Sequence, residues 1–393
     1  MVNLFCGIDI SKDSFHATLI NENQKILSSL AFPMSSPGFL SFLQSLLHHC
    51  QNTQNLIIGM ESSGSYYLNL FSFLTSHNLN CLLLNPLLIS NFSKLSLRKT
   101  KTDRKDSLLI AEFLRVNAPN LPKPEASSVD LRPLARERER ISQHIAALKN
   151  EIKRVLYLLF PELLGLINPF TSSSLRLLQN FPSRKAFSTT TPSQIRRFFS
   201  LPQRGRKNSA SPEKLISAAK KSVGLDSPFY EQILKTKIII LITLQEELKK
   251  ITTLLVEASK KKASGQMEIL KSIKGINDIT SSHFLAEIDN KEFSSPKKMI
   301  AFAGVDPSIH ESGQFKGKSR ISKRGNKSLR RVLYLMATSV IKVNPIFREY
   351  FQRKKAQGKR FKEAVMAVIH KLIRVIYTLL ARQSHFILCP NSL

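Results

Sequence analysis

Two apolar seams in the middle of the sequence constrain the fold more than any other feature. Their residues alternate at spacings of four and three, the heptad rhythm of helices that pack along their length. The first seam consists of Ile141, Ile145, Leu148, Ile152, Val155 and Leu159, and the second of Leu241, Leu244, Leu248, Ile251 and Leu255. Either could be an amphipathic helix packed inside its own domain. Two that bracket a separate segment favour an antiparallel coiled-coil stalk, which could also serve as a dimer interface.

The stalk divides the chain into three predicted domains, so the predicted fold class is multidomain α/β plus α. Residues 1–125 form the first domain. The stalk covers 126–265 and carries a small helical insert at 166–228, and a mainly helical domain covers 266–393. Apolar patterns in the insert and the last domain predict short helices at 175–178, 194–199 and 213–219, a helix-turn-helix over 269–288, and apolar helices at 329–343 and 361–381.

The first domain alternates strand-like and helix-like signals. Short apolar runs between polar turns predict strands at 4–10, 15–20, 26–32, 56–60 and 81–84. Longer runs predict helices at 39–49, 66–76 and 106–116, and Pro86 is expected to end the last strand. This alternation is typical of a mixed α/β domain.

Positive charge is the strongest indication of a partner. The chain carries 59 Lys and Arg against 28 Asp and Glu, a net charge of +31, and such an excess normally persists because a polyanion neutralises it. Anionic membranes and acidic proteins are alternatives, but the basic residues run through most of the chain, which favours nucleic acid. The most basic stretch, residues 312–331, has eight Lys or Arg and no acid.

Cysteine and apolar patterns argue against zinc-binding, secreted and membrane classes. The four cysteines are scattered without a C-x-x-C pair, which indicates neither a zinc site nor a disulfide framework. The N-terminus is expected to be a strand and not a signal peptide. The longest candidate span, 238–244, is far shorter than the roughly 20 apolar residues that cross a bilayer. We therefore expect a soluble cytoplasmic protein, associated with the bacterial nucleoid.

Acidic residues are scarce early in the chain, which makes their positions informative. Asp9 lies inside an apolar strand, where a carboxylate is costly unless it binds a cation or is otherwise paired. Glu61 ends another strand, and Asp103 and Asp106 share one face at a helix start. Together they could surround one or two Mg²⁺ ions, which prefer oxygen ligands. Each acid alone could equally be a turn residue or a helix-start residue favoured by the helix dipole.

Three motifs around these acids resemble a known family. They are Gly-Ile-Asp-Ile-Ser-Lys-Asp at 7–13, Gly-Met-Glu-Ser-Ser-Gly-Ser-Tyr at 59–66 and Lys-Thr-Asp-Arg-Lys-Asp-Ser at 101–107. They resemble the DEDD transposases of the IS110 superfamily of insertion sequences, relatives of the Piv-type recombinases. The resemblance implies an N-terminal RuvC-like domain with a ribonuclease H fold. It also implies a catalytic, metal-binding quartet of Asp9, Glu61, Asp103 and Asp106.

The C-terminal part is similar to the same family over about residues 268–381. The matching runs are Phe-Ala-Gly-Val-Asp-Pro-Ser-Ile-His-Glu-Ser-Gly at 302–313 and Ile-Ser-Lys-Arg-Gly-Asn-Lys-Ser-Leu-Arg-Arg at 321–331. The resemblance implies that Ser312 is a nucleophile that forms a covalent phosphoserine with DNA. Independently, a serine needs activation and charge stabilisation to attack a phosphodiester, and cations follow Ser312 closely. His310 is the nearest histidine, but no spacing indicates a Ser-His-Asp triad.

The predicted partners are donor and target DNA, a structured guide or bridge RNA implied by the resemblance, and further copies of the chain in a dimer or tetramer. In that assembly, Ser312 of one subunit would meet the carboxylates of another. The residues expected to contact nucleic acid are Arg98, Lys99, Lys101, Arg104, Lys105, Lys316, Lys318, Arg320, Lys323, Arg324, Asn326, Lys327 and Arg330.

The sequence therefore predicts a transposase that cleaves and exchanges DNA strands through a serine and a Mg²⁺-bound carboxylate site. One alternative is a RuvC-like nuclease or junction resolvase that uses the carboxylates and water alone. A second alternative is a nucleic-acid-binding protein without catalytic activity, which would bind with a steep salt dependence but be indifferent to Mg²⁺.

Overall fold

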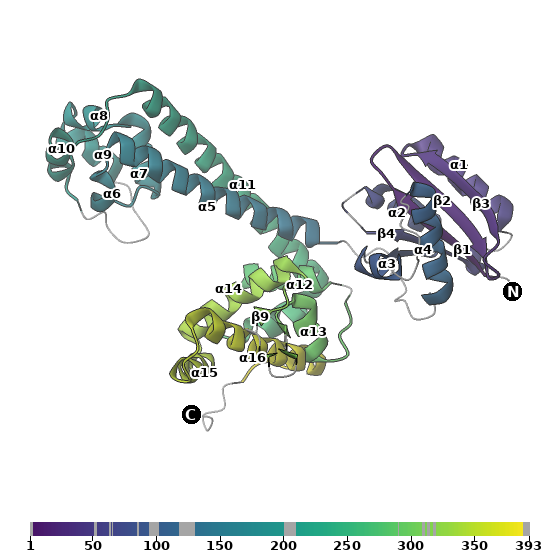
Figure 1. The fold of residues 1–393 in the computed structure, drawn as a ribbon. Helices are drawn as coiled ribbons and strands as arrows, with labels where there is room; N and C mark the ends of the chain where they lie inside the picture. Colours follow the sequence, from purple (N-terminus) through teal and green to yellow (C-terminus); the bar gives the residue numbers. More distant parts are fainter. Residues whose placement is uncertain are drawn as a thin grey trace. The chain divides into compact units, whose positions relative to one another are not determined.

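The computed structural model describes residues 3–50, 53–62, 64, 66–84, 86–93, 102–117, 130–199, 210–289, 291–308, 311–312, 315–316 and 320–387. The chain divides into two compact units, residues 1–128 and 129–393, and each is described by itself (Figure 1). The mixed α/β and α composition confirms the predicted class at this level. The boundaries at 125 and 265 stay predictions.

The first unit is built on a five-stranded sheet in the order β3-β2-β1-β4-β5. The first three strands form an antiparallel meander, while β4 runs parallel to β1 and β5 parallel to β4. This arrangement is compatible with a ribonuclease H-like domain. The strands are β1 (Leu4–Ile10), β2 (Ser14–Asn21), β3 (Ile26–Pro33), β4 (Leu56–Glu61) and β5 (Cys81–Leu84).

Helices cover both faces of the sheet, because the apolar side chains alternate along the strands. One face packs against α1 (Ser36–His49) and α2 (Tyr67–Ser76), and the other against α3 (Pro86–Ser93) and α4 (Asp103–Asn117). A short 3-10 helix, Thr53–Asn55, precedes β4. Thus Cys6 and Ile8 of β1 lie in the α1/α2 core, and Phe5 lies in the α3/α4 core.

Three helix starts differ from prediction. Ser35 accepts a hydrogen bond from Gly38 and caps α1, so this helix begins at Ser36, before the predicted residue 39. Pro86 does more than end β5, because it opens α3, where its fixed φ suits the first helical turn. The fourth helix begins at Asp103 and not at residue 106.

In the second unit, both seams pack against each other within one chain. Helices α5 (Arg132–Leu159) and α11 (Pro228–Lys271) lie side by side (Figure 1). They are antiparallel, because Arg138 Nε donates to Thr252 Oγ1 at 3.0 Å while Lys237 Nζ lies 2.5 Å from Glu151 Oε2. The second helix is kinked at Ala263 and extends to Lys271, beyond residue 265, where the stalk is predicted to end.

The segment between the two long helices is helical, as predicted. The expected helices lie within three of its five, and they share one apolar core with the adjacent end of the stalk. The five are α6 (Leu163–Leu166), α7 (Ser172–Asn180), α8 (Arg184–Ser188), α9 (Pro192–Phe199) and α10 (Pro212–Lys220).

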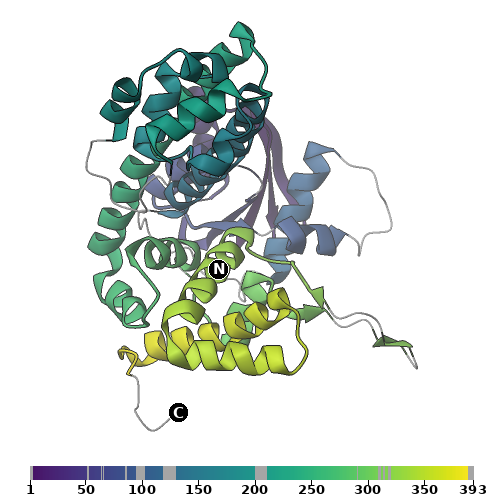
Figure 2. The ribbon, with the colours of Figure 1, turned by 90° about the vertical axis from the view of Figure 1, so that its left-hand side faces the viewer.

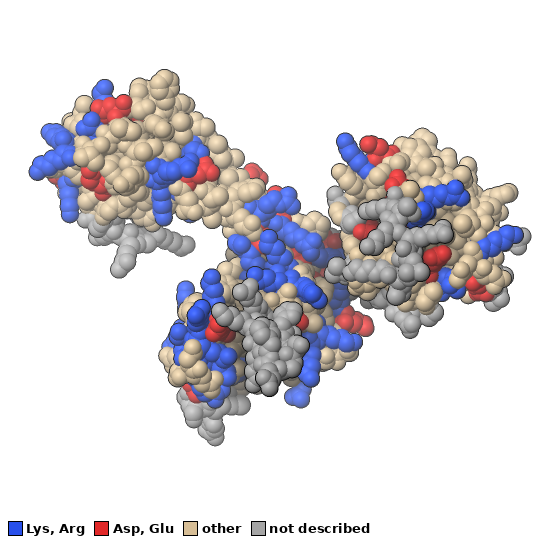
Figure 3. Space-filling view, in the orientation of Figure 1, with Lys and Arg blue, Asp and Glu red and all other residues tan. Residues whose placement is uncertain are grey.

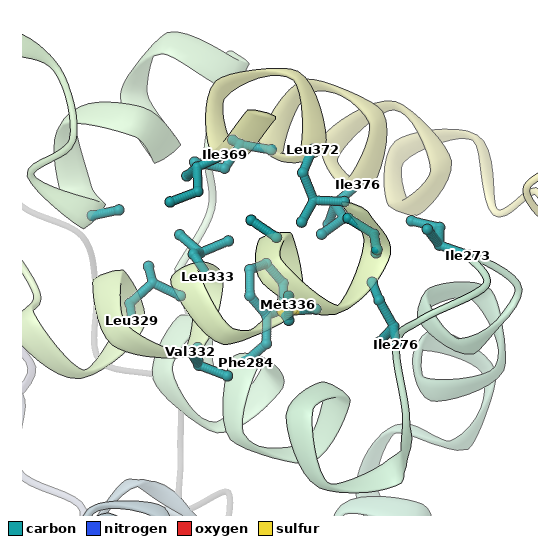
Figure 4. Close-up of a cluster of buried hydrophobic side chains, with 14 of the residues drawn as sticks. Ile273, Ile276, Phe284, Leu329, Val332, Leu333, Met336, Ile369, Leu372 and Ile376 are labelled. Atoms are coloured by element: carbon teal, nitrogen blue, oxygen red, sulfur yellow. The ribbon is translucent and has the colours of Figure 1, made fainter. Parts of the chain in front are cut away.

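The C-terminal part has its own core (Figure 4). Phe284, Leu333, Met336 and Leu372 are fully buried there. The helices around it are α12 (Asp278–Ile288), α13 (Pro296–Ala303), α14 (Lys327–Val343), α15 (Pro345–Ala356) and α16 (Phe361–Arg382). The predicted helix-turn-helix is the end of α11, a turn and α12.

The expectation that 238–244 is the longest candidate span was wrong. In the described part of the chain, α16 alone is long and apolar enough to cross a membrane, by length and composition only. One row of its apolar side chains, which includes Val368, Ile369 and Ile376, is fully buried in the C-terminal core. Its composition is therefore that of a core helix.

Candidate active site

Two glycines let α4 approach the sheet closely. A Cβ atom on Gly7 would lie 2.2 Å from the backbone oxygen of Ser107 and 2.3 Å from the backbone nitrogen of Ala111. A Cβ on Gly59 would lie 2.7 Å from a methyl group of Leu114. Because Gly7 has no side chain, the helix backbone lies directly on β1, and the absence of a side chain on Gly59 leaves room for the Leu114 side chain on β4.

The strand register brings two of the predicted acids together. Ile8 of β1 pairs with Met60 of the parallel strand β4, so the next residues in each strand are Asp9 and Glu61. Side chains alternate along a strand. Asp9 therefore shares the face of Gly7, which is the face that α4 covers. The helix contributes Asp103 and Asp106 in its first turn.

The pKa of Asp9 shows that the four acids are electrostatic neighbours. Partial burial, followed by the negative charges of Asp106, Asp103 and Glu61, raises this pKa to about 6. Such like-charge repulsion is what a bound cation would relieve, and carboxylate oxygens are the donors that Mg²⁺ prefers. The chemistry of the quartet thus fits a divalent ion. Among the described residues, however, no three His, Cys, Asp or Glu side chains are close enough to hold one ion.

A polar chain that the sequence analysis missed anchors the start of α4. The hydroxyl of Ser107 lies 3.0 Å from His16 Nδ1 and 2.7 Å from Thr18 Oγ1, and Thr18 in turn contacts Ser29 at 2.9 Å. His16 is the register partner of Asp9. Burial, followed by the charge of Arg104, lowers the pKa of His16. A polar residue at alternate positions of an otherwise apolar β2 was the available signal.

The predicted basic residues beside the quartet are only partly described. Arg104 and Lys105 are exposed in the first turn of α4. Arg98, Lys99 and Lys101 lie outside the described residues.

Ser312 lies in a nested pair of short hairpin strands that follows α13 (Figure 2). At the base, β6 (Pro307–Ser308) pairs with β9 (Arg320–Ile321). Further out, β7 (Glu311–Ser312) pairs with β8 (Phe315–Lys316), and Ser312 is the register partner of Phe315. The backbone therefore places Ser312 next to the turn of the hairpin. The side chains of Ser312, Lys316 and Arg320, and all of Lys318, lie outside the described residues.

Comparison with known proteins gives family matches to two separate parts of the chain. Residues 6–161 match a family model described as a transposase, of the DEDD type of IS110, and residues 267–352 match a model described as the transposase IS116/IS110/IS902 family. The two matches cover more than half of the chain. The chain belongs to the IS110 family of DEDD transposases.

Individual relatives agree with this assignment. The pilin gene-inverting protein of Moraxella lacunata is 24% identical over 98% of each chain. The 44.8 kDa protein of insertion element IS116 from Streptomyces clavuligerus is 20% identical over 98% of this chain and 97% of its own. The 42 kDa protein of IS900 from Mycobacterium paratuberculosis is 32% identical over 29% of each chain. The protein is thus a DNA transposase or recombinase, and its DEDD domain implies dependence on a divalent metal.

Some cations that follow the hairpin face solvent, while others have partners within the transposase. Lys323, Arg324 and Lys327 are exposed. Arg330 donates to the carbonyl oxygen of Ala303 at 2.9 Å. Their predicted contacts with nucleic acid stay predictions.

Asn326 has two partners inside the protein. Its side-chain oxygen caps α14 by accepting from Leu329 at 3.0 Å, and its nitrogen donates to Glu287 Oε2 at 2.6 Å. Arg136 of α5 holds the same carboxylate through two hydrogen bonds, of 2.9 and 3.0 Å. Burial opposes ionisation of Glu287, but these bonds outweigh it and lower the pKa.

A second buried carboxylate, that of Glu139, lies on α5 one helical turn after Arg136. Glu139 accepts from Ser328 Oγ at 2.6 Å and pairs with Arg331 at 3.2 Å. The ring of His283 lies 2.7 Å from the same Ser328 oxygen. These two carboxylates join the base of the stalk to α12 and to the start of α14, directly after the Ser-Lys-Arg-Gly-Asn motif.

Proposed function

We propose that this transposase excises and integrates its own insertion sequence by serine chemistry that depends on the carboxylate quartet. The observation that carries the proposal is that Asp9, at a strand end, is near enough to Asp106, Asp103 and Glu61 for their negative charges to add to the effect of its burial, which together raise the pKa of that carboxyl to about 6. Acids are scarce in this positively charged chain, and the repulsion between these four is what a shared cation would relieve.

In the proposed reaction, Ser312 Oγ attacks a DNA phosphorus atom. A bond from Oγ to phosphorus forms and the bond to one sugar oxygen breaks, while the hydroxyl proton is lost to solvent and the leaving sugar oxygen takes up a proton. A sugar hydroxyl of a second strand then attacks the phosphoserine and releases the serine. Each step exchanges one phosphoester for another, so the bond energy is conserved for rejoining.

Asp9, Glu61, Asp103 and Asp106 would hold one or two Mg²⁺ ions. When bound, such ions stabilise negative charge on the oxygens around a reacting phosphate. The protein's own part is to hold the four carboxylates together through the close packing of α4 on the sheet. Arg104 and the exposed cations after the hairpin would position the DNA backbone.

The proposal places Ser312 of one subunit with the carboxylates of another, in a dimer or tetramer. Exposed apolar side chains on α11 support self-association, because Phe229, Ile233, Ile240 and Leu254 lie four, seven and fourteen residues apart, with Glu247 at the heptad position between the last two. This heptad stripe differs from the one that packs against α5. Light scattering of the purified protein would report the oligomer, and a monomer would contradict this part.

The net charge of +31 supports a structured RNA as a further partner besides DNA. Expression with the flanking DNA of the element, followed by sequencing of co-purified RNA and recombined junctions, tests this part. Absence of a specific RNA from an active preparation would contradict it. The expected setting is the bacterial nucleoid in the cytoplasm.

Substitution of the nucleophile tests the chemistry. We expect Ser312→Ala to abolish recombination and the covalent protein–DNA adduct, while Ser319→Ala, in the same basic stretch, retains both. Asp9→Asn should abolish strand cleavage with the serine intact. If Ser312→Ala still cleaves and leaves no adduct, the protein is instead a metal-dependent nuclease that activates water.

A further inference from the structure

A second cation-rich surface lies on α15, on the turn after it and on the first half of α16, outside the stretch 312–331. It comprises Arg353, Lys354, Lys355, Lys359, Arg360, Lys362 and Lys371, and is called the α15–α16 surface below. All seven residues follow residue 352, where the second family match ends. Figure 3 shows Lys and Arg gathered over α15.

Few acids neutralise this surface. Between residues 345 and 382 the only acids are Glu349 and Glu363. Glu363 accepts from the backbone nitrogen of Arg360 at 3.0 Å and so caps α16. Within the described part of the chain, no ion pair joins any of the seven cations to a carboxylate.

Three of the cations converge on one aromatic ring. Lys371 Nζ lies 4.8 Å from the ring centre of Tyr350, Arg353 Cζ lies 5.3 Å away and Lys354 Nζ 5.4 Å away. Cation–π attraction holds them at the ring. Burial, followed by the charge of Arg353, lowers the pKa of Lys371, as expected where like charges are held together.

The charge of Glu349 acts on Lys371, but no carboxylate among the described residues forms an ion pair with the three cations. Converging cations of this kind suit an anion that offers several oxygen acceptors. A phosphodiester is such an anion, and Lys and Arg are its usual partners. The turn at Gly358, whose φ is 79°, leads directly to Lys359, Arg360 and Lys362, which are exposed. The positive charge therefore extends beyond the ring, along enough surface for more than one phosphate.

We propose that the α15–α16 surface binds the backbone of double-stranded DNA without regard to sequence. DNA is the partner that transposase activity requires, and lysine and arginine contacts to phosphate carry no sequence information. DNA binding by the α15–α16 surface does not require the serine or the metal. This proposal and the proposed function can therefore fail independently of each other.

Salt-dependent binding of the full-length protein tests the proposal. The variant carries Arg353→Gln, Lys354→Gln and Lys371→Gln. Its matched control carries Lys185→Gln, Lys220→Gln and Lys221→Gln, exposed residues of the stalk insert, and has the same net charge. The probes are two fluorescent DNA duplexes of unrelated sequence, followed by anisotropy over a series of salt concentrations.

We expect the slope of log K against log salt to fall by about 0.9 for each phosphate that the variant no longer neutralises, equally for both duplexes, and to stay unchanged in the control. A separate variant with Lys354→Arg and Lys371→Arg should bind DNA as wild type does, because it keeps both positive charges. Equal slopes in variant and control would overturn the proposal. Loss of binding to a single-stranded RNA probe, with duplex binding intact, would overturn the choice of DNA.

If the first variant melts early, Lys359→Gln with Arg360→Gln and Lys362→Gln tests the same surface. These side chains are exposed, so their removal should leave the fold intact. An unchanged salt slope in this second variant would also refute the proposal.

Discussion

Gly7→Ala is the sharpest test of how the carboxylates are assembled. The new methyl group would lie 2.2 Å from the backbone oxygen of Ser107 and 2.3 Å from the backbone nitrogen of Ala111. Ordinary contacts at a Cβ are at least 3.4 Å, and backbone atoms of a helix cannot rotate away. The helix α4 must therefore move away from β1 by about 1 Å.

Two costs add in this variant. Overpacking typically costs about 1–3 kcal/mol, and backbone contacts place this case near the upper end. Movement of α4 also strains the hydrogen bonds that join Ser107 with His16 and with Thr18, each of which contributes about 1 kcal/mol. We expect a loss of about 4 kcal/mol in the stability of the first unit, together with loss of recombination because Asp106 moves with the helix.

Hydrogen exchange on the full-length protein measures this loss region by region. Peptides from α4 and β1 should lose protection in Gly7→Ala. Gly59→Ala should lose less, because its nearest contact is the flexible end of Leu114. Gly165→Ala is the control, since no atom lies within 4 Å of its added Cβ. Unchanged protection of α4 in Gly7→Ala would refute the close packing.

Three further predictions concern single groups. The pKa of Asp9 is raised from 3.8 to about 6, so the metal-free protein should lose stability as pH rises between these two values. Asp9→Asn should therefore melt at a higher temperature than wild type above pH 6, but not near pH 4. Identical melting curves of the two proteins in the presence of a chelator would contradict this. Arg136→Leu should destabilise the second unit by about 3–5 kcal/mol, because it leaves the fully buried Glu287 without its cation. Glu287→Leu should cost less, because Arg136 is half exposed and its guanidinium can be solvated by water. Denaturant titration of both variants measures which one loses more stability. Ser107→Ala should cost about 1–2 kcal/mol by removing one of the two hydroxyl partners of the buried Thr18, the other being Ser29, and Ser107→Thr should recover most of this loss. Equal stability of the two variants in denaturant titration would count against the polar chain.

The sequence alone is enough to predict the elements that repeat locally. Alternating apolar residues predict β1 to β5 to within two residues, and heptad spacing predicts that α5 and α11 are long helices. The scarcity of acids singles out Asp9 and Glu61, because a carboxylate among apolar residues is costly unless it binds a cation or is otherwise paired. The roles of the quartet and of Ser312 came from resemblance to a family, and they stay predictions.

Short helices escaped the sequence analysis although their signals were present. Helices α13 and α15 each follow a capping residue and begin with proline, as Ser295-Pro296 and Asn344-Pro345. Their apolar residues are too few to establish a helical period. Only packing against α14 and α16 makes them stable elements.

Tertiary structure alone decided which distant groups meet. No spacing in the sequence shows that Gly7 must be bare to admit α4, that Ser107 would join His16 to Thr18, or that Glu287 would bind Arg136 of another helix 151 residues away. Such contacts depend on strand register and on the packing of whole helices. The sequence by itself determines the hydrophobic periods of individual helices and strands. The energy of a buried charge depends on neighbouring groups that only the folded molecule brings together.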